Sequence, residues 1–472
     1  MEFISTRGKS PKVGFEQALL EGLAPDGGLY VPTIWPLVDQ KTQDWMAEAS
    51  FAEVAALIIS KFSGDAFDYN ALLPLAEKAY GSFSHPQTTP VSRFGEQGAQ
   101  DWLLELYHGP TLAFKDVAMQ FLGQLFASVL KRQNKRVTII GATSGDTGAA
   151  AIEAFRGLEQ VDVFILHPHG RVSDVQRRIM TSVNEPNIFN IAVDGTFDDC
   201  QRIVKELFAD RPLTEQLSLG GVNSINWVRL AVQIVYYFTT AAALKEQTSK
   251  LSFVAPTGNF GDIFAGYAAK KMGAPIDRLC IAVNDNDILY RAITTGRYQP
   301  LGVKQTTSPS MDIQVASNFE RLIFEASGRD ASVAQHFVDA VGTPEGATIP
   351  AGVLDAIAQD FIAEKATEAE VAEIILDFSK GENRLIDPHT AVGIAAMRKA
   401  RAAETLTSAV VTLSTAHAAK FPDSVEAAAG ARPSLPSQFS DLNDRPETCM
   451  SAPADRQAIK DILMTHAKAA GN

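Results

Sequence analysis

Short apolar runs alternate with longer amphipathic stretches along the middle of the chain. Residues 137–140, for example, are mostly β-branched and end at Gly141, and a helical pattern over 149–155 follows them. Apolar strands separated by helices are typical of a parallel sheet that is covered on both faces. The pattern therefore predicts an α/β fold. Further strands are expected at 161–166, 188–193, 252–255, 279–283 and 409–413, and further helices at 172–182 and 197–208.

The regions outside this alternation suggest separate units. Residues 1–95 carry helical patterns at 15–23 and 47–62, around a Gly27-Gly28 turn, and a Pro- and Gly-containing cluster at 86–98 predicts a boundary. Residues 306–370 are less regular, apart from a predicted helix at 318–326. The expected domains are an N-terminal domain at 1–95, a catalytic region at 96–430 with a smaller α/β subdomain at about 135–220 and an insertion at about 306–370, and a tail at 431–472 that ends in a helix over 455–468.

Composition limits the class of protein. A chain of 472 residues is too long for one core. Its net charge of -13 argues against general affinity for nucleic acid or anionic membranes. Three widely separated cysteines predict free thiols in a reducing compartment, and CxxC and HExxH motifs, which bind metals, do not occur. With no secretory signal and no long apolar run, we expect a cytoplasmic protein.

The segment HGPTLAFKD, residues 108–116, contains a lysine with unusual neighbours. Lys115 follows Leu112, Ala113 and Phe114 and precedes Asp116, at the start of a predicted helix over 117–130. Apolar surroundings lower the pKa of a lysine, whereas a neighbouring carboxylate raises it. A neutral amine attacks aldehydes and forms Schiff bases. The alternative is a surface lysine at a helix start.

Glycine-containing loops follow two of the predicted strands. Residues 141–148 (GATSGDTG) and 256–262 (PTGNFGD) both lead from a strand into a helix, where backbone N–H groups can bind an anion. Ligands of parallel sheets bind at these carboxyl ends. Two such loops predict two anionic groups, such as a cofactor phosphate and a substrate carboxylate, although both could be ordinary tight turns. The first loop lacks the lysine of a P-loop, which argues against a nucleotide kinase.

Two further segments carry polar side chains suited to ligand binding. Residues 223–229 (NSINWVR) combine amides, a hydroxyl and a guanidinium, which suit a phosphate monoester. The sequence STAH at 414–417 ends a strand with hydroxyls that could face a heteroaromatic nitrogen. A capped helix start is the alternative for each of them.

In combination, these segments resemble the threonine synthases in their longer bacterial and fungal form. That family consists of pyridoxal-phosphate enzymes with the tryptophan-synthase-β fold, also called fold type II. HGPTLAFKD, SGDTG, NSINWVR, PTGNFGD and STAHAAKF occur here in the family's order, and residues 5–8 and 16–32 resemble the family's own N-terminal domain. The resemblance extends over most of the chain.

The resemblance implies a role for each matching residue. Lys115 would bind pyridoxal 5′-phosphate covalently, and Thr415 would face the pyridine nitrogen. Asp146 would lie near the cofactor's 3′-oxygen, where an asparagine is common in broader relatives. The cofactor phosphate would lie against Gly258, Asn259, Phe260 and Gly261, with Asp262 in the same loop. The substrate would contact Ser144, Gly145, Thr147, Asn223, Ser224 and Arg229.

The implied activity is conversion of O-phospho-L-homoserine and water to L-threonine and phosphate, by a monomer or homodimer. The alternatives are another enzyme of this fold, such as a serine/threonine dehydratase or a cysteine synthase, and a catalytically silent binding protein. His167, His169 and His389 are interpreted as structural residues. Lys420 lies either near the cofactor phosphate or on the surface.

Overall fold

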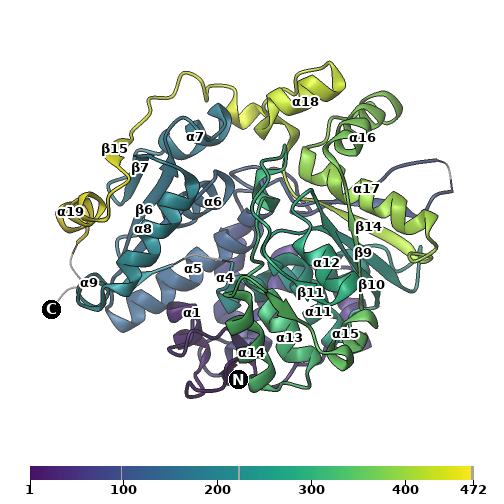
Figure 1. Cartoon of the computed structure of the whole chain (residues 1–472), viewed down its shortest axis with the longest axis horizontal. Coiled ribbons are helices and arrows are strands. Elements are labelled where there is room, and N and C mark those ends of the chain that lie inside the picture. Colours follow the sequence, from purple (N-terminus) through teal and green to yellow (C-terminus); the bar gives the residue numbers. More distant parts are fainter. Residues whose placement is uncertain (97, 222–223, 469–472) are drawn as a thin grey trace.

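The computed structural model describes residues 1–96, 98–221 and 224–468, which form two mainly parallel sheets covered by helices (Figure 1). In these residues the larger sheet has the strand order β13-β10-β9-β14-β4-β3, and β3 is antiparallel to β4. Its strands are β3 (Val91–Arg93), β4 (Asp101–Glu105), β9 (Leu251–Pro256), β10 (Ile276–Val283), β13 (Phe361–Lys365) and β14 (Ala409–Ser414).

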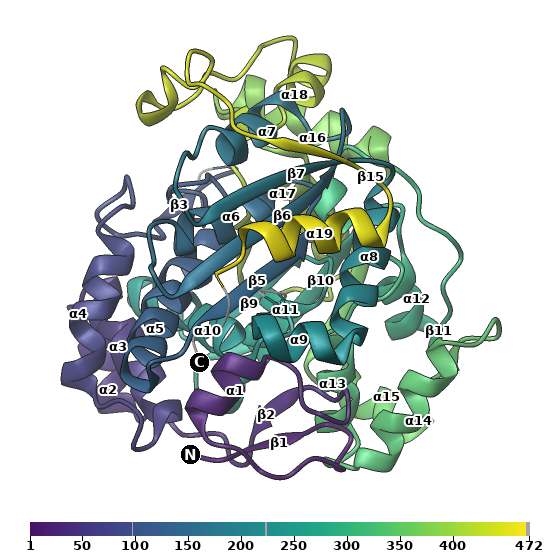
Figure 2. The same cartoon turned by 90° about the vertical axis from the view of Figure 1, so that its left-hand side faces the viewer.

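The smaller sheet has the order β15-β7-β6-β5-β8 in the described residues, and these strands pair in parallel. Its strands are β5 (Val137–Ala142), β6 (Val161–Pro168), β7 (Ile188–Asp194), β8 (Leu219–Gly220) and β15 (Met450–Pro453). Figure 2 shows β15, from the C-terminal part of the chain, running beside β7. Strands β5 to β8 of this sheet lie within the predicted subdomain at 135–220, and β15 comes from the tail.

Alternate residues of the smaller sheet enter two different cores. Ile139 and Val163 pack with the helix that follows β5, whereas Ile140 and Phe164 pack with the helix that follows β7. Successive strand residues point to opposite faces, so a sheet that is apolar at every position must be covered on both. Its helices are α6 (Asp146–Phe155), α7 (Asp174–Thr181), α8 (Phe197–Ala209), α9 (Arg211–Leu217) and α19 (Arg456–His466).

The larger sheet is also enclosed. Residues 232–238 lie within a helix whose central residues are almost all buried. Around this sheet lie α5 (Lys115–Gln133), α10 (Trp227–Ala243), α11 (Gly261–Lys271), α12 (Ile288–Thr295), α13 (Phe319–Ala326), α14 (Ala331–Val341), α15 (Ala351–Ala358), α16 (Glu368–Gly381), α17 (Pro388–Ala402) and α18 (Pro422–Ala429), with β11 (Arg297–Tyr298), β12 (Ala347–Thr348) and the 3-10 turns η1 (Pro309–Met311) and η2 (Ala418–Lys420). The 3-10 turn η3 (Ser437–Phe439) lies in the segment between α18 and β15.

The N-terminal residues pack beneath both sheets (Figure 1). The predicted helices at 15–23 and 47–62 are present, the second beginning only after the capping residue Ser50. This region contains β1 (Phe3–Ser5), α1 (Phe15–Glu21), β2 (Tyr30–Pro32), α2 (Gln40–Met46), α3 (Phe51–Ser63) and α4 (Tyr69–Tyr80). The short strands, α2 and α4 were not expected from the sequence.

The structure adds regular elements to the regions that the sequence left undefined. Residues 306–370 are irregular up to α13, apart from η1, and are largely regular from α13 onward; they include β13, which pairs with β10 in the larger sheet. The boundary cluster at 86–98 contains β3, an edge strand of the same sheet. The tail contributes β15 as well as its predicted helix. Short edge strands carry too few residues for their alternation to show in the sequence.

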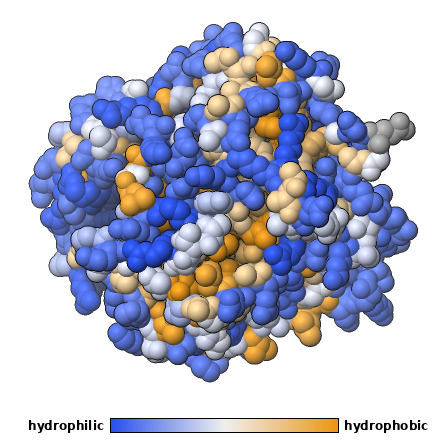
Figure 3. Space-filling model, turned by 45° about the vertical axis from the view of Figure 1, so that its right-hand side comes forward, coloured by the Kyte–Doolittle hydropathy of each residue, from blue (hydrophilic) through white to orange (hydrophobic). Residues whose placement is uncertain are grey.

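The surface agrees with the composition. Most of the face in Figure 3 is hydrophilic, and hydrophobic side chains gather on it only in patches. Cys200 and Cys280 are buried free thiols, and Cys449 is an exposed one. In the part of the chain that the structure describes, no helix is both long enough and apolar enough to cross a membrane.

Candidate active site

Lys115 is the first residue of α5 and is buried, with 7% of its surface exposed. The loop before it is fixed to the loop after β14. The N–H of Phe114 donates to the carbonyl of Thr415 at 2.8 Å, and the N–H of His417 donates to the carbonyl of Leu112 at 3.0 Å. Lys115 and Thr415 therefore lie at the same edge of the larger sheet, as the sequence predicted, and the surface-lysine alternative is wrong.

Asp116 has a different part in this loop from the one expected. Its carboxylate accepts the N–H and the hydroxyl of Thr111, at 2.7 and 2.6 Å. Burial raises the pKa of Asp116 to about 6 in spite of these hydrogen bonds. Asp116 therefore shapes the loop, and another carboxylate faces the Lys115 amine.

That carboxylate is Asp146, at the start of α6. Its Oδ2 lies 3.4 Å from Lys115 Nζ, and its Oδ1 lies 2.7 Å from Lys420 Nζ and 2.9 Å from Gln176 Nε2. Burial would raise the pKa of Asp146, but the positive charges of Lys420 and Lys115 hold it well below its usual range. Burial lowers the pKa of Lys115 more than Asp146 raises it.

The rest of the SGDTG loop is held in shape by Thr143, whose hydroxyl accepts the N–H groups of Gly145 and Gly148 at 2.9 Å each. Gly145 has a φ of 138°, and a Cβ there would lie 2.6 Å from the Gln176 side chain. Only glycine fits this position. Ser144 and Thr147 are half-buried beside it, so three of the predicted substrate residues share one loop with Asp146.

The PTGNFGD loop forms the start of α11. Phe260 has a φ of 65°, the left-handed conformation that turns successive N–H groups toward one point. A Cβ on Gly258 would lie 2.6 Å from the Ser310 carbonyl, whereas a Cβ on Gly261 would meet only ordinary contacts. Asn318 Nδ2 fixes this loop by donating to the carbonyl of Asn259 at 2.9 Å.

The start of α10 lies next to the PTGNFGD loop. A Cβ on Gly261 would lie 3.8 Å from Ser224 Cβ, and Asn318 Nδ2 also donates to the Ser224 carbonyl at 3.2 Å. Arg229 is buried, and burial lowers its pKa to about 10 against the opposing charge of Asp262. Asn223, which the sequence placed in the same group, lies outside the described residues.

Asp262 interacts electrostatically with both Lys115 and Arg229. Burial raises its pKa to about 6, although backbone hydrogen bonds and the positive charges of Lys115 and Arg229 oppose this effect. The start of α11 is therefore close enough to both cations for their charges to act on one carboxyl group.

Four further side chains lie at the site. The sequence left two alternatives for Lys420 and predicted a structural role for His389, and it did not single out Ser310 or Gln176. Ser310 Oγ lies 3.2 Å from Lys115 Nζ and 3.3 Å from Asp146 Oδ2, and its N–H donates to His389 Nε2 at 3.3 Å. Lys420 is completely buried, so its surface alternative is wrong. Gln176 and His389 complete the group. Polar residues on four separate segments give no local sequence signal, because only the tertiary structure brings them together.

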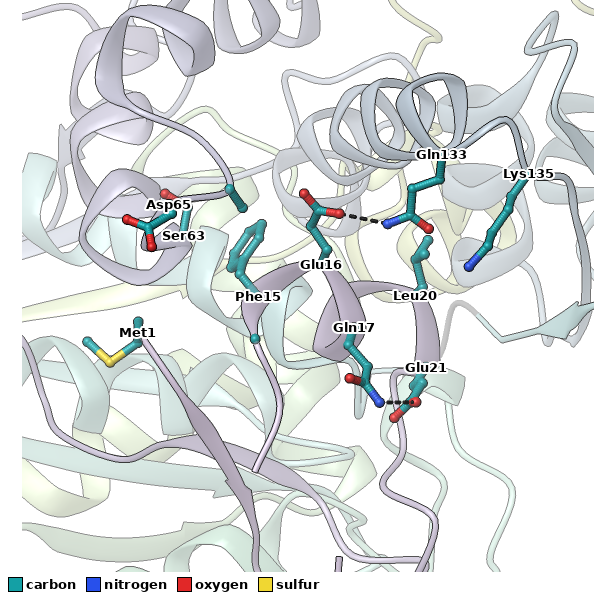
Figure 4. A pocket seen from close by; sticks show the side chains of 12 residues that line it. Met1, Phe15, Glu16, Gln17, Leu20, Glu21, Ser63, Asp65, Gln133 and Lys135 are labelled. Atoms are coloured by element: carbon teal, nitrogen blue, oxygen red, sulfur yellow. Dashed lines mark hydrogen bonds between the residues drawn. The ribbon is translucent and has the colours of Figure 1, made fainter. Parts of the chain in front are cut away.

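A separate cavity of about 780 Å³ lies at the other end of α5 (Figure 4). In the wall of this cavity, Gln133 donates a hydrogen bond to Glu16 at 2.7 Å, and Gln17 donates one to Glu21 at 2.8 Å. Gln133 ends the 19-residue helix that Lys115 begins. A rise of 1.5 Å per residue separates these ends by roughly 27 Å, so the cavity is remote from the site.

Three family models match successive parts of the chain. The model "Threonine synthase N terminus" matches residues 2–80, "Pyridoxal-phosphate dependent enzyme" matches residues 85–416, and "Threonine synthase, C-terminal" matches residues 390–463.

Curated and solved relatives extend over nearly the whole length. The threonine synthase of Pseudomonas aeruginosa is 42% identical over 468 residues, with 99% of this chain and 98% of that protein covered. The crystal structure of pyridoxal-phosphate-bound threonine synthase from Brucella melitensis has a TM-score of 0.95 and 46% identity, over 99% of this chain and 100% of that one. Yeast threonine synthase has a TM-score of 0.92 and 37% identity, over 98% of both chains.

Proposed function

Because this chain belongs to the threonine synthase family, we propose that Lys115 binds the cofactor and moves the substrate's protons in the family's reaction. The chain is a pyridoxal-phosphate-dependent lyase that converts O-phospho-L-homoserine and water to L-threonine and phosphate. One observation carries the residue assignment. The Lys115 amine is buried next to Asp146, whose loop follows β5 of the smaller sheet, and the second glycine loop follows β9 of the larger sheet.

The residues around Lys115 fit pyridoxal phosphate. When bound, this cofactor supplies an aldehyde that reacts with amines and a ring that accepts electron density from the substrate's carbon atoms. Gly258, Asn259, Phe260 and Gly261 would hold its phosphate, since the left-handed Phe260 begins an 11-residue helix. Thr415, buried at the end of β14, would face the ring nitrogen.

The substrate would be held at its two anionic ends. Ser144, Gly145 and Thr147 would bind the carboxylate at the start of α6. Ser224 and Arg229 would bind the substrate phosphate together with Asn223. Homoserine would lack the charge-assisted contacts that the phosphate makes with these groups, which would cost roughly several kcal/mol and would disfavour the unphosphorylated substrate.

Lys115 would carry out the proton transfers. Its amine, released by the incoming amino acid, would take the proton from the substrate's Cα, because a flexible lysine with a lowered pKa is a suitable general base. A second proton would leave Cβ and phosphate would leave Cγ. Cγ would then gain a proton, the hydroxyl of water would add at Cβ, and Cα would regain its proton. Arg229 and Ser224 would hold the phosphate during its departure.

The test uses Lys115→Ala. This variant should lose the cofactor's visible absorbance and release of phosphate from phosphohomoserine, because no amine remains to react with the aldehyde. Spectra and phosphate release are measured for both proteins. A matched Lys12→Ala variant, at a side chain 59% exposed, should retain both properties. Normal absorbance and turnover in Lys115→Ala would contradict the assignment.

We also propose a cytoplasmic location and a monomer or homodimer. The buried free thiols Cys200 and Cys280 support a reducing compartment.

A further inference from the structure

A second lysine, Lys420, is buried at the site. None of its surface is exposed, and its Nζ donates to Asp146 Oδ1 and to the carbonyl of Thr111, both at 2.7 Å. A fully buried ammonium is stable only with such partners. Lys420 is the last residue of η2, which follows shortly after β14 ends at Ser414, so the larger sheet helps to fix its position.

Lys115 and Lys420 contact the Asp146 carboxylate unequally. Oδ1 has the short contact with Lys420, whereas Oδ2 lies 3.4 Å from Lys115 and accepts from Ser310 at 3.3 Å. One carboxylate neutralises one cation, and the attraction increases as the distance falls. Asp146 is therefore paired mainly with Lys420, and its interaction with Lys115 is the weaker of the two.

We propose that Lys420 is a positioning residue that holds the Asp146 carboxylate, so that the weakly paired Lys115 amine reacts as a neutral nucleophile. This inference rests on the role proposed for Lys115. Without Lys420, the carboxylate would pair with Lys115 and hold it as an ammonium ion, which does not attack an aldehyde.

The other charged groups around the amine agree with this arrangement. Burial is the main cause that lowers the Lys115 pKa, and the positive charges of Lys420 and of Arg229 on α10 lower it further. Asp146 on α6 raises it, and Asp262 on α11 interacts with it. Beyond these, His389 on α17 acts on Asp146. Loss of the Lys420 charge should therefore shift the titration of Lys115 upward.

Lys420 would also assist with the cofactor's 3′-oxygen, which neighbours the aldehyde on the ring. Asp146 is the residue proposed to lie near this oxygen when the cofactor is bound. An ionised carboxylate repels a negatively charged oxygen, and a buried cation on the far side of the carboxylate reduces this repulsion.

The test compares Lys420→Met with Lys420→Arg. The first keeps the length of the side chain without its charge, and the second keeps the charge. Pyridoxal phosphate is added to enzyme stripped of it, and the rate at which visible absorbance returns is measured from pH 6 to pH 10. In Lys420→Met, the midpoint of this pH dependence should rise by about one pH unit or more. The rate of absorbance return near pH 7 should therefore fall about tenfold. Lys420→Arg should restore the midpoint toward that of the unaltered enzyme. An unchanged midpoint in Lys420→Met would overturn the proposal, because a merely structural role would change the amplitude or the stability alone.

A second variant keeps the inference testable if Lys420→Met does not fold. Asp146→Asn removes the negative charge from the same group and should move the midpoint downward. A midpoint that stays constant or rises would overturn the proposal. The Lys115→Ala variant separates the two assignments. If it loses the visible absorbance while Lys420→Met titrates normally, the Lys115 role stands and only the Lys420 role fails. If it keeps the absorbance, the Lys115 assignment itself fails.

Discussion

The side chains around Asp146 are arranged so that buried charges have partners. Its carboxylate lies between two lysines, Gln176 and Ser310, which come from four different segments. An isolated buried charge costs several kcal/mol, roughly, whereas a paired and hydrogen-bonded charge is tolerated. Burial keeps the pKa of Lys115 low, and the charge of Lys420 lowers it further against the effect of Asp146, so the amine is prepared for reaction.

The proposed phosphate site predicts that a change at Arg229 affects substrate binding more than cofactor binding. Arg229→Ala should raise the KM for phosphohomoserine about a hundredfold or more, because a charge-assisted contact is lost, while cofactor absorbance stays close to normal. Steady-state kinetics and spectra check this expectation. Arg229→Lys is the matched control and should recover part of the loss. Equal loss of absorbance and substrate affinity would show that Arg229 serves the cofactor instead.

Gly258 offers a second test at single-residue scale. A Cβ there would lie 2.6 Å from the Ser310 carbonyl, so Gly258→Ala should displace Ser310 from Lys115 and weaken cofactor binding about tenfold or more. A cofactor titration followed by absorbance measures this effect. Gly141→Ala is the control, because a Cβ there meets only Ile165 at 3.7 Å. Similar cofactor affinity in both variants would contradict the predicted crowding.

Among the elements, the short turn η2 carries Lys420 into the site. His417 caps it, with Nδ1 accepting the N–H of Ala419 at 3.1 Å. The cap requires a lone pair on Nδ1, so it exists only while the imidazole is neutral. Burial and the nearby His108 lower the pKa of His417 to about 4, against the attraction of Asp387.

This cap predicts a pH dependence of stability. The pKa of His417 is about 4 in the fold and about 6.5 when unfolded, so the unfolded chain takes up the proton first as the pH falls. Stability is therefore fully present above pH 6.5 and decreases as the pH falls toward 4. His417→Asn keeps an acceptor and removes the titration, so its Tm should fall less over this range.

The control for that measurement is His169→Asn, because the His169 side chain is 62% exposed. This variant should lose Tm with falling pH as the unaltered enzyme does. If His417→Asn and His169→Asn behave alike, the cap is not the source of the pH dependence.

At the scale of the whole molecule, the N-terminal residues are joined to the catalytic region by buried contacts. Glu320 on α13 accepts the hydroxyl of Thr6 at 2.5 Å and the guanidinium of Arg7 at 3.2 and 3.1 Å. On the same helix, Arg321 donates to the carbonyls of Tyr30 and Ile225. The N-terminal region thereby reaches the start of α10, where the substrate phosphate is proposed to bind.

Glu320→Ala should lower the free energy of unfolding by about 2 kcal/mol, because it leaves Arg7 and Thr6 without their shared acceptor. Thermal or denaturant unfolding measures the change. The control is Glu2→Ala, which breaks an ion pair whose side chains are 59% and 61% exposed and should cost less than about 0.5 kcal/mol. Equal losses of stability in Glu320→Ala and Glu2→Ala would show that the buried contacts of Glu320 do not hold the N-terminal region to the catalytic region.

The sequence alone determined the interior strands, their helices, the lysine at a helix start and the glycine loops. Each is encoded in consecutive residues by periodicity or by a turn that requires glycine. The tertiary structure alone decided that Asp146, and not Asp116, faces Lys115, that Lys420 is buried, and that Ser310 lies above Gly258. It also decided that β3, β13 and β15 join the sheet edges. Such features depend on burial and on pairing between residues far apart in the chain, such as Lys420 and Thr111, which are 309 positions apart, so no local pattern encodes them.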